Sequence, residues 1–353
     1  MIRVLIADDS PTFREWLRYT LKRDPEIVIV GEAVNGSQAI ELARKKQPDI
    51  ITMDIHMPEM DGYEAIAQIM EKHPIPIIVL SSAISKQEIS ASFKALEAGA
   101  IAVLGKPSDL QDNSKLEEDI LLHIKSLSRV NVVRRRTKKN TTELPKSTPI
   151  KDSALIKGLP EILEPFELIV MGGSAGGPQA IQSILKDLPH NLSIPILITM
   201  HISKGFIESF SDWLSRSTQL QCKVAEHGEI MQAGIVYLAA DNAHLLPNSN
   251  HILNNSNQAP VDNFKPSITA MFEAAASQFG AHTLGILLTG MGKDGARGLK
   301  KIKDAGGYTI AQDKTSSMIF SMPKSAIEMN AAIEICHLDH IAGRILNLLE
   351  SKK

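Results

Sequence analysis

The first third of the chain alternates short apolar runs with longer amphipathic stretches. The apolar runs predict buried strands at Val4–Ala7, Ile27–Val30, Ile50–Met53, Ile77–Leu80 and Ala102–Leu104. The stretches between them have apolar residues at helical spacing and predict helices at Thr12–Lys22, Ser37–Lys46, Tyr63–Lys72 and Glu88–Ala98. This alternation predicts a doubly wound, flavodoxin-like α/β domain with five parallel strands.

The same alternation returns after Glu167. Apolar runs predict strands near Leu168–Met171, Pro195–Met200, Ile235–Ala239, Leu284–Thr289 and Tyr308–Ala311. Several are followed by amphipathic stretches, which predict helices at Gln179–Lys186, Phe206–Ser215 and Pro266–Phe279. We expect a second α/β domain with a mostly parallel sheet, and no sequence repeat links it to the first.

Residues 125–165 differ from both flanking regions. They contain the basic run Arg134-Arg135-Arg136-Thr137-Lys138-Lys139 and then Thr, Lys and Pro without apolar periodicity. This composition predicts a flexible basic linker between domains at residues 1–124 and 166–353. A basic run is also typical of a nucleic-acid-binding arm. No DNA-binding motif accompanies it, so we expect a tether and no nucleic-acid partner.

Composition narrows the class of protein. The chain has 353 residues, enough for two ordinary domains, and its formal net charge of −2 favours neither nucleic acid nor a membrane surface. Cys222 and Cys336 are far apart, which fits a reducing compartment and excludes a disulfide framework. Carboxylates appear too early for a signal peptide, and no apolar run is long enough to span a membrane. We therefore expect a cytoplasmic protein with no membrane insertion.

Polar side chains stand at the ends of four predicted strands of the first domain. Asp8 and Asp9 follow the first strand, Asp54 the third, Ser81 the fourth and Lys106 the fifth. Because parallel strands end at one edge of a sheet, these groups should converge. Any one aspartate could simply cap a helix. Together, the carboxylates predict a site for a hard divalent cation and a phosphoryl acceptor, with lysine and hydroxyl groups binding the transferred oxygens.

The segment Asp54-Ile55-His56-Met57-Pro58-Glu59-Met60-Asp61-Gly62 and the pair Lys106-Pro107 resemble the receiver domains of two-component response regulators, over about residues 1–124. The resemblance implies that a partner histidine kinase phosphorylates Asp54. It also implies Mg²⁺ held by Asp9, Asp54 and the His56 backbone carbonyl, with Asp8 assisting. Receivers often carry an aromatic switch residue three positions before the lysine, where this chain has Val103. That departure puts signal transmission by an aromatic rotamer in question.

A second group of polar residues follows strands of the second domain. Ser174 lies in the glycine-rich turn after Leu168–Met171, His201 follows Pro195–Met200, and Asp294 lies in a glycine-rich segment after Leu284–Thr289. A serine hydroxyl becomes a good nucleophile when an imidazole takes its proton and a carboxylate orients that imidazole. The glycines near Met291 leave backbone N–H groups available for an oxyanion. The pattern predicts a serine hydrolase.

Other residues of the same types are alternatives for the base and the carboxylate. The rival histidines are His190, His227, His244, His251 and His282. Asp241 and Asp262 are rivals for the carboxylate. We favour His201 because it directly follows an apolar strand, and Asp294 because of its glycine-rich setting. The turn at Ser174 fits neither the dinucleotide fingerprint nor a phosphate-binding loop, which would need a lysine.

Four segments resemble the chemotaxis protein-glutamate methylesterase family. They are Met171–Pro178, His201–Phe206, Leu287–Ala296, and Gly306–Asp313 with Met322-Pro323. The order of receiver, linker and hydrolase also matches over essentially the whole chain. The resemblance implies Ser174 as nucleophile, His201 as base, Asp294 as its orienting group and the Met291 amide as oxyanion donor. The implied reaction is hydrolysis of glutamate γ-methyl esters on chemoreceptors, with deamidation of receptor glutamines as a second activity.

The chain departs from that family's pattern at three places. Ala175 replaces a threonine after the nucleophile, Met200-His201-Ile202 replaces Gln-His-Met, and Asn263–Thr269 differs from the usual Arg-Pro-Ser-Val-Asp segment. We expect no cofactor in the hydrolase domain, and a receiver that hinders access to Ser174 until Asp54 is phosphorylated. The alternatives are a gated hydrolase of another ester or amide, and a non-catalytic module that binds a partner when phosphorylated.

Overall fold

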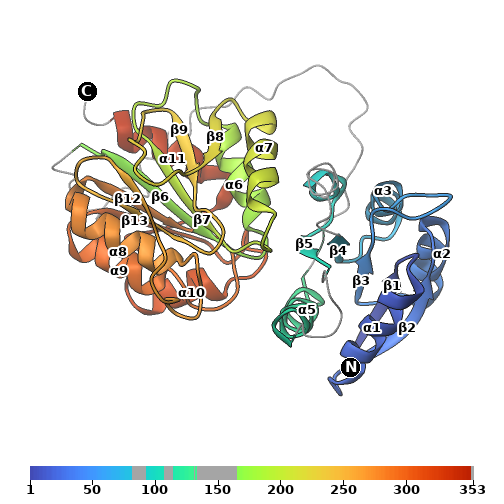
Figure 1. Ribbon diagram of the computed structural model, residues 1–353. Helices are drawn as coiled ribbons and strands as arrows, with labels where there is room; N and C mark the ends of the chain where they lie inside the picture. Colours follow the sequence, from blue (N-terminus) through green and yellow to red (C-terminus); the bar gives the residue numbers. More distant parts are fainter. Residues whose placement is uncertain (82–92, 107–113, 131, 133–164, 351–353) are drawn as a thin grey trace.

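The computed structural model describes residues 1–81, 93–106, 114–130, 132 and 165–350. These residues form two α/β domains (Figure 1). Among the described residues, no helix is both long and apolar enough to cross a membrane. The basic run at 134–139 lies outside the described residues, as does most of the predicted linker.

The N-terminal domain is built on a five-stranded parallel sheet in the order β2-β1-β3-β4-β5. Its strands are β1 (Ile2–Ala7), β2 (Ile27–Ala33), β3 (Ile50–Met53), β4 (Ile77–Ser81) and β5 (Ala102–Gly105). Nearly all positions of β1, β3 and β4 are buried, as expected for strands covered by helices on both faces. The predicted doubly wound fold is confirmed.

The helices of this domain begin where a polar side chain caps them. Ser10, Asn35 and Asp61 each accept a hydrogen bond from the backbone N–H three residues later. The helices are α1 (Pro11–Lys22), α2 (Gly36–Lys46), α3 (Gly62–Lys72), residues 93–98 and α5 (Ser114–Leu127). The first part of the predicted helix Glu88–Ala98 lies outside the described residues. The sequence reading did not predict α5, which continues past residue 124.

The C-terminal domain has a seven-stranded parallel sheet in the order β14-β13-β12-β6-β7-β9-β8. Its strands are β6 (Leu168–Gly173), β7 (Ile196–Met200), β8 (Gln221–Val224), β9 (Ile235–Leu238), β12 (Thr283–Leu287), β13 (Tyr308–Gln312) and β14 (Glu334–Cys336). A separate antiparallel hairpin consists of β10 (His244–Pro247) and β11 (Leu253–Ser256). The mostly parallel sheet is confirmed. The predictions missed β8, β10, β11 and β14, which are only three or four residues long.

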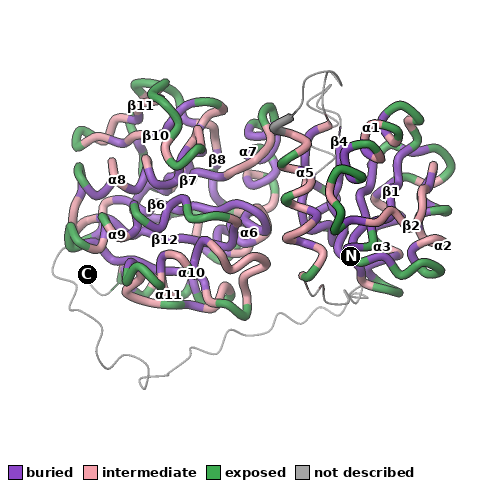
Figure 2. Tube along the Cα trace, turned by 90° about the horizontal axis from the view of Figure 1, so that it is seen from below, coloured by how far each residue is buried: buried purple, intermediate pink, exposed green. Residues whose placement is uncertain are grey.

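Helices cover both faces of this sheet, and the buried strands form the middle layer (Figure 2). Successive side chains of a strand point to opposite faces, so Ile169 and Met171 pack with one set of helices while Leu168 and Val170 pack with the other. The first set is α6 (Gly177–Lys186), α7 (Ile207–Ser217) and α11 (Leu338–Glu350). The second set is α8 (Ile268–Phe279), α9 (Ala296–Asp304) and α10 (Ser321–Glu328).

The two domains contact each other through an aromatic cluster. Phe93 of the N-terminal domain is fully buried against three rings of α7 and the residue before it, namely Phe206, Phe210 and Trp213. The ring centroids lie 5.5 to 6.5 Å from that of Phe93. The Trp213 indole N–H also donates to Glu97 Oε1 at 2.8 Å. An apolar core therefore runs continuously from one domain into the other.

Candidate active site and phosphoacceptor pocket

Ser174 is the first residue after β6, at the carboxyl edge of the central part of the sheet. Its backbone N–H donates to the Thr289 carbonyl at 3.0 Å, which ties the turn to the segment after β12. Gly176 has a φ of 77° and starts α6, a conformation that side chains rarely adopt. Gly290 also has to be a glycine, because an added Cβ would lie 2.7 Å from the Cβ of Ser174. The turn therefore presents the Ser174 hydroxyl at the strand end.

His201 follows β7, the strand paired with β6. Its backbone N–H donates to the Gly173 carbonyl at 3.1 Å, so it is held beside the Ser174 turn. On the side chain, Nε2 lies 2.8 Å from Asp294 Oδ2. The other ring nitrogen, Nδ1, is buried and has no hydrogen-bond partner within the described part of the chain. Nδ1 is therefore the ring atom available to take a proton.

Asp294 is 1% exposed. It accepts hydrogen bonds from residues at the N-terminus of α8 and from the backbone N–H of Gly295. The Ser267 hydroxyl and the backbone N–H groups of Ile268, Thr269 and Gly295 donate to it at 2.8 to 2.9 Å. Burial alone would raise the pKa of this carboxyl. The hydrogen bond and charge of His201, followed by the Thr269 donors, outweigh burial and lower the pKa. Asp294 is thus an ionised carboxylate at the N-terminus of α8, where negative charge is favourable.

The candidate oxyanion donor, Met291, lies in the turn after β12. Its backbone N–H has no acceptor among the described residues. Its side chain reaches the other domain, where the Ser126 hydroxyl of α5 lies 2.8 Å from the Met291 sulfur. The amide is therefore available to a ligand, while the side chain is engaged by the N-terminal domain.

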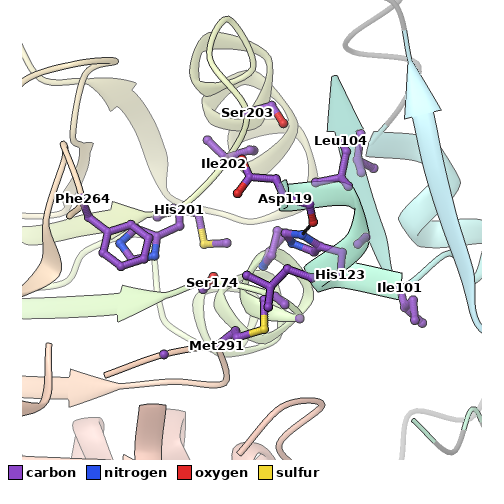
Figure 3. Close-up of a pocket in the computed structure, with 18 of the residues that line it drawn as sticks. Ile101, Leu104, Asp119, His123, Ser174, His201, Ile202, Ser203, Phe264 and Met291 are labelled. Carbon is purple, nitrogen blue, oxygen red and sulfur yellow. Dashed lines mark hydrogen bonds between the residues drawn. The ribbon is translucent and has the colours of Figure 1, made fainter. Parts of the chain in front are cut away.

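A cavity of about 320 Å³ lies at this edge of the sheet, with residues of both domains in its walls. Ser174, His201 and Met291 line it, and Figure 3 shows their side chains grouped together. From the N-terminal domain, its walls include Ile101, Leu104, Asp119, Leu122 and His123. Ser174 itself is only 9% exposed. The N-terminal domain therefore covers the edge of the sheet that carries the candidate nucleophile.

The rival residues of the sequence analysis lie elsewhere. None of the five rival histidines lines the cavity. His244, for example, is buried between the Ala259 carbonyl and the Ser267 N–H. Asp241 accepts from the Gly205 N–H at 2.6 Å, and Asp262 pairs with Arg297 on the surface. The structure thus brings His201 and Asp294 into contact next to Ser174 and leaves the alternatives outside.

The second predicted site is at the carboxyl edge of the N-terminal sheet. Lys106 Nζ lies 2.7 Å from an oxygen of Asp8 and 2.7 Å from one of Asp54. Burial raises the pKa of Asp8, and the Lys106 charge opposes that rise. Ser81 is buried at the end of β4, and its carbonyl accepts from the Lys106 N–H at 2.7 Å. The structure thus brings four of the predicted residues together.

The same edge has the donor atoms that a magnesium ion prefers. One carboxylate oxygen each from Asp8, Asp9 and Asp54 lies within 4.8 Å of the others. Oxygen ligands with this charge suit a hard divalent cation, so the residues fit the predicted Mg²⁺. The His56 N–H approaches Asp54 Oδ1 at 3.4 Å. The role of the His56 carbonyl as a ligand stays a prediction.

Several features of the site were not foreseen. Phe264 stacks on the His201 ring, and Ser203 accepts a hydrogen bond from the Gly105 N–H of the other domain at 3.1 Å. Both residues lie in segments that were compared with the family pattern, but each contact joins segments distant in sequence, so no local pattern signals it. Val103, which replaces the aromatic switch residue, is half-buried and lines the interdomain cavity.

The fold and the two candidate sites fit one class of protein: a hydrolase domain whose candidate active site is covered by a receiver-like domain. Comparisons with known proteins agree with this class. The CheB methylesterase family matches residues 169–345, and the response regulator receiver domain family matches residues 4–116.

Relatives align with the whole chain. Protein-glutamate methylesterase/protein-glutamine glutaminase 1 of Syntrophus aciditrophicus (strain SB) is 41% identical over 352 residues, which are 99% of each chain. A second relative of that name, from Methanospirillum hungatei JF-1, is 42% identical and covers 94% of each chain. The crystal structure of the Thermotoga maritima CheB methylesterase catalytic domain matches with a TM-score of 0.50 at 33% identity, over 53% of this chain and 100% of that one. The chain belongs to the protein-glutamate methylesterase family, and its N-terminal domain is a receiver domain.

Proposed function

We propose that this chain is a phosphorylation-activated methylesterase that hydrolyses glutamate γ-methyl esters of chemoreceptors and deamidates certain receptor glutamines. The observation that carries the proposal is the bond between His201 Nε2 and Asp294 Oδ2 beside Ser174, in a chain that aligns end to end with relatives of that name. Its expected place is the cytoplasm, where a partner histidine kinase would supply the phosphoryl group.

The site supports acyl transfer through Ser174. Oγ attacks the ester carbonyl carbon while His201 Nδ1 takes the hydroxyl proton. The negative charge then formed on the carbonyl oxygen is bound by the Met291 N–H. Asp294 stabilises the imidazolium through Nε2, so the two ring nitrogens have the reverse of their usual triad roles, in which Nδ1 faces the carboxylate.

Collapse of this intermediate breaks the bond to the methoxy oxygen, and His201 returns its proton to release methanol. Water then attacks the acyl-serine, with His201 again taking a proton, and the products are glutamate and free Ser174. A receptor glutamine follows the same path with ammonia as the first leaving group. No cofactor is needed for either step.

The receiver supplies the switch. Asp54 is the proposed phosphoacceptor, since its carboxylate is next to Lys106 and the other two aspartates of the pocket. Asp8, Asp9 and Asp54 would hold Mg²⁺, which supplies charge neutralisation for phosphoryl transfer. Lys106 now bridges Asp8 and Asp54, and it would have to give up part of this contact to bind the transferred oxygens.

The docked receiver explains why the unphosphorylated arrangement would be inactive. Ser174 is 9% exposed, and residues of the N-terminal domain line the cavity over it. A receptor helix would have to reach Ser174 at an edge of the sheet that the receiver covers. Phosphorylation would therefore act by shifting the population toward an undocked arrangement.

Methanol release from methylated receptor membranes tests the proposed chemistry. Ser174→Ala should abolish release, whereas Ser183→Ala, a change on α6 away from the cavity, should leave it intact. A serine-directed phosphonate should label the wild type at Ser174. Hydrolysis of generic esters without methanol release from receptors would indicate a different substrate. Absence of both hydrolysis and labelling would support a binding module instead.

A further inference from the structure

Phe264 lies flat against the imidazole of His201. The two ring centroids are 3.9 Å apart and the planes differ by 6°, and Figure 3 shows the rings overlapping. This is closer than the 4.5 to 7 Å typical of aromatic pairs in proteins. One face of the imidazole is therefore covered by a rigid, planar side chain.

A tight turn holds Phe264 in this place. The Val261 N–H donates to the Phe264 carbonyl at 3.1 Å, and the Phe264 N–H donates back to the Val261 carbonyl at 3.0 Å. The two residues between them, Asp262 and Asn263, have φ values of 52° and 69°. Two consecutive positive φ values are the mark of a type I′ hairpin turn, and Asp and Asn tolerate them best among non-glycine residues. The backbone at Phe264 is thus well defined.

The same short segment also holds Asp294. Ser267, three residues after Phe264, is the N-cap residue of α8, and its hydroxyl donates to Asp294 at 2.9 Å. The backbone N–H of Ser267 donates to Nδ1 of the buried His244 at 3.2 Å, and this bond anchors the segment in the core. One continuous stretch of backbone therefore fixes both the carboxylate at the edge of the imidazole and the ring on its face.

A single hydrogen bond does not fix an imidazole. The bond to Asp294 restrains Nε2, but it leaves the ring free to swing about that contact. Nδ1 has no partner among the described residues, and Ala175, which follows the nucleophile, has no hydroxyl to offer. The contact with Phe264 restrains the plane of the ring, which the bond to Asp294 does not.

We propose that Phe264 is a positioning residue that holds the plane of the His201 imidazole, so that Nδ1 is aimed at the Ser174 hydroxyl when the proton is transferred. The inference rests on the proposed function, because Phe264 acts through the base of that reaction. Orientation of a proton acceptor affects the chemical step more than ground-state binding. Loss of the flat ring should therefore lower kcat and leave KM nearly unchanged.

The test compares flat and non-flat side chains at this position in the full-length, phosphorylated protein, with methanol release from methylated receptors as the assay. Phe264→Leu and Phe264→Met keep apolar bulk without a planar face. We expect kcat to fall roughly three- to tenfold, which is the rate ratio that corresponds to the interaction energy of an aromatic pair. Phe264→Tyr keeps the ring and should retain kcat. If Phe264→Leu does not fold, Phe264→Met provides the same comparison.

Phe279→Leu is the matched control, because Phe279 is a buried ring that also contacts a histidine. Its centroid lies 5.5 Å from that of His251 at an interplanar angle of 58°, and it is at the opposite end of α8 from Ser267. It should lower the thermal midpoint but not kcat. The proposal is overturned if Phe264→Leu and Phe264→Met keep the wild-type kcat. It is also overturned if KM rises at constant kcat, because Phe264 would then contribute to substrate binding and not to the position of His201. A wild type that releases no methanol would instead refute the proposed function.

Discussion

The backbone N–H of Gly105 donates a hydrogen bond to the hydroxyl of Ser203 across the domain interface, with an N···O distance of 3.1 Å. Gly105 directly precedes Lys106, which contacts Asp54, and Ser203 lies two residues after His201. One peptide bond and one hydrogen bond therefore connect the pocket of the proposed phosphoacceptor to the segment of the proposed base. This connection needs no aromatic switch residue, and Val103 is compatible with it.

Removing this hydrogen bond should weaken docking of the receiver. For Ser203→Ala we expect the unphosphorylated rate of methanol release to rise roughly two- to fivefold, since one such bond contributes about 1 kcal/mol. The phosphorylated rate should change little, because the bond is broken in the open arrangement. Ser217→Ala is the control, since that hydroxyl bonds within its own helix. An unphosphorylated rate equal to that of the wild type would show that the bond does not stabilise docking.

The aromatic cluster should contribute more to docking than any hydrogen bond. Phe93→Ala removes the ring that packs on Phe206, Phe210 and Trp213, and deletion of a buried phenylalanine costs about 3 to 5 kcal/mol. We expect the unphosphorylated rate to approach the phosphorylated one.

Trp213→Phe gives a graded comparison for the same interface. It keeps a ring in the cluster but loses the bond to Glu97 and part of the buried indole, so its effect should be smaller than that of Phe93→Ala. Phosphate incorporation at Asp54 checks that the receiver of each variant is folded. A Phe93→Ala protein that remains as inhibited as the wild type would contradict the role given to the cluster.

Asp294 and Asp241 offer a direct comparison between the chosen carboxylate and its rival. Asp294→Asn should reduce kcat by roughly 10³- to 10⁴-fold, because an amide supports the wrong imidazole tautomer and does not stabilise the imidazolium. Asp241→Asn should affect kcat little, since Asp241 bonds to the Gly205 N–H instead of a histidine. Comparable losses in the two variants would mean that Asp294 does not orient the base.

Asp294 should also make stability depend on pH. Its pKa in the folded protein is lowered, so its contribution is fully present above the unfolded pKa of about 3.9 and is lost as the pH falls through the folded value. Urea unfolding of the wild type and Asp294→Asn between about pH 6 and pH 3 measures this contribution. The stability difference should be constant above about pH 5 and shrink below it. A difference that grows with acidity would refute the lowered pKa.

Much of the fold could be predicted because parallel α/β domains carry a strong repeating signal. Buried strands such as Ile50–Met53 are largely apolar, and their positions were predicted closely. The family was also identified correctly from its motifs. The convergence of Ser174, His201 and Asp294 followed from one rule, that parallel strands end at one edge of the sheet. The catalytic roles themselves stay predictions.

Contacts between distant segments could not be predicted in this way. The helix start that binds Asp294 depends on where α8 packs, and the stacking of Phe264 depends on a turn closed by two backbone bonds. The docking of Phe93 against α7 depends on the fit of two finished surfaces. Short edge strands such as Glu334–Cys336 were missed because three residues carry no periodicity.

We expect phosphorylation of Asp54 to release the receiver from the edge of the sheet that carries Ser174. The most direct test measures methanol release from methylated receptor membranes with and without a small phosphodonor and Mg²⁺, for the wild type and for Asp54→Ala. The donor should accelerate the wild type and leave Asp54→Ala at its basal rate. An unchanged wild-type rate, or equal acceleration of both proteins, would contradict it.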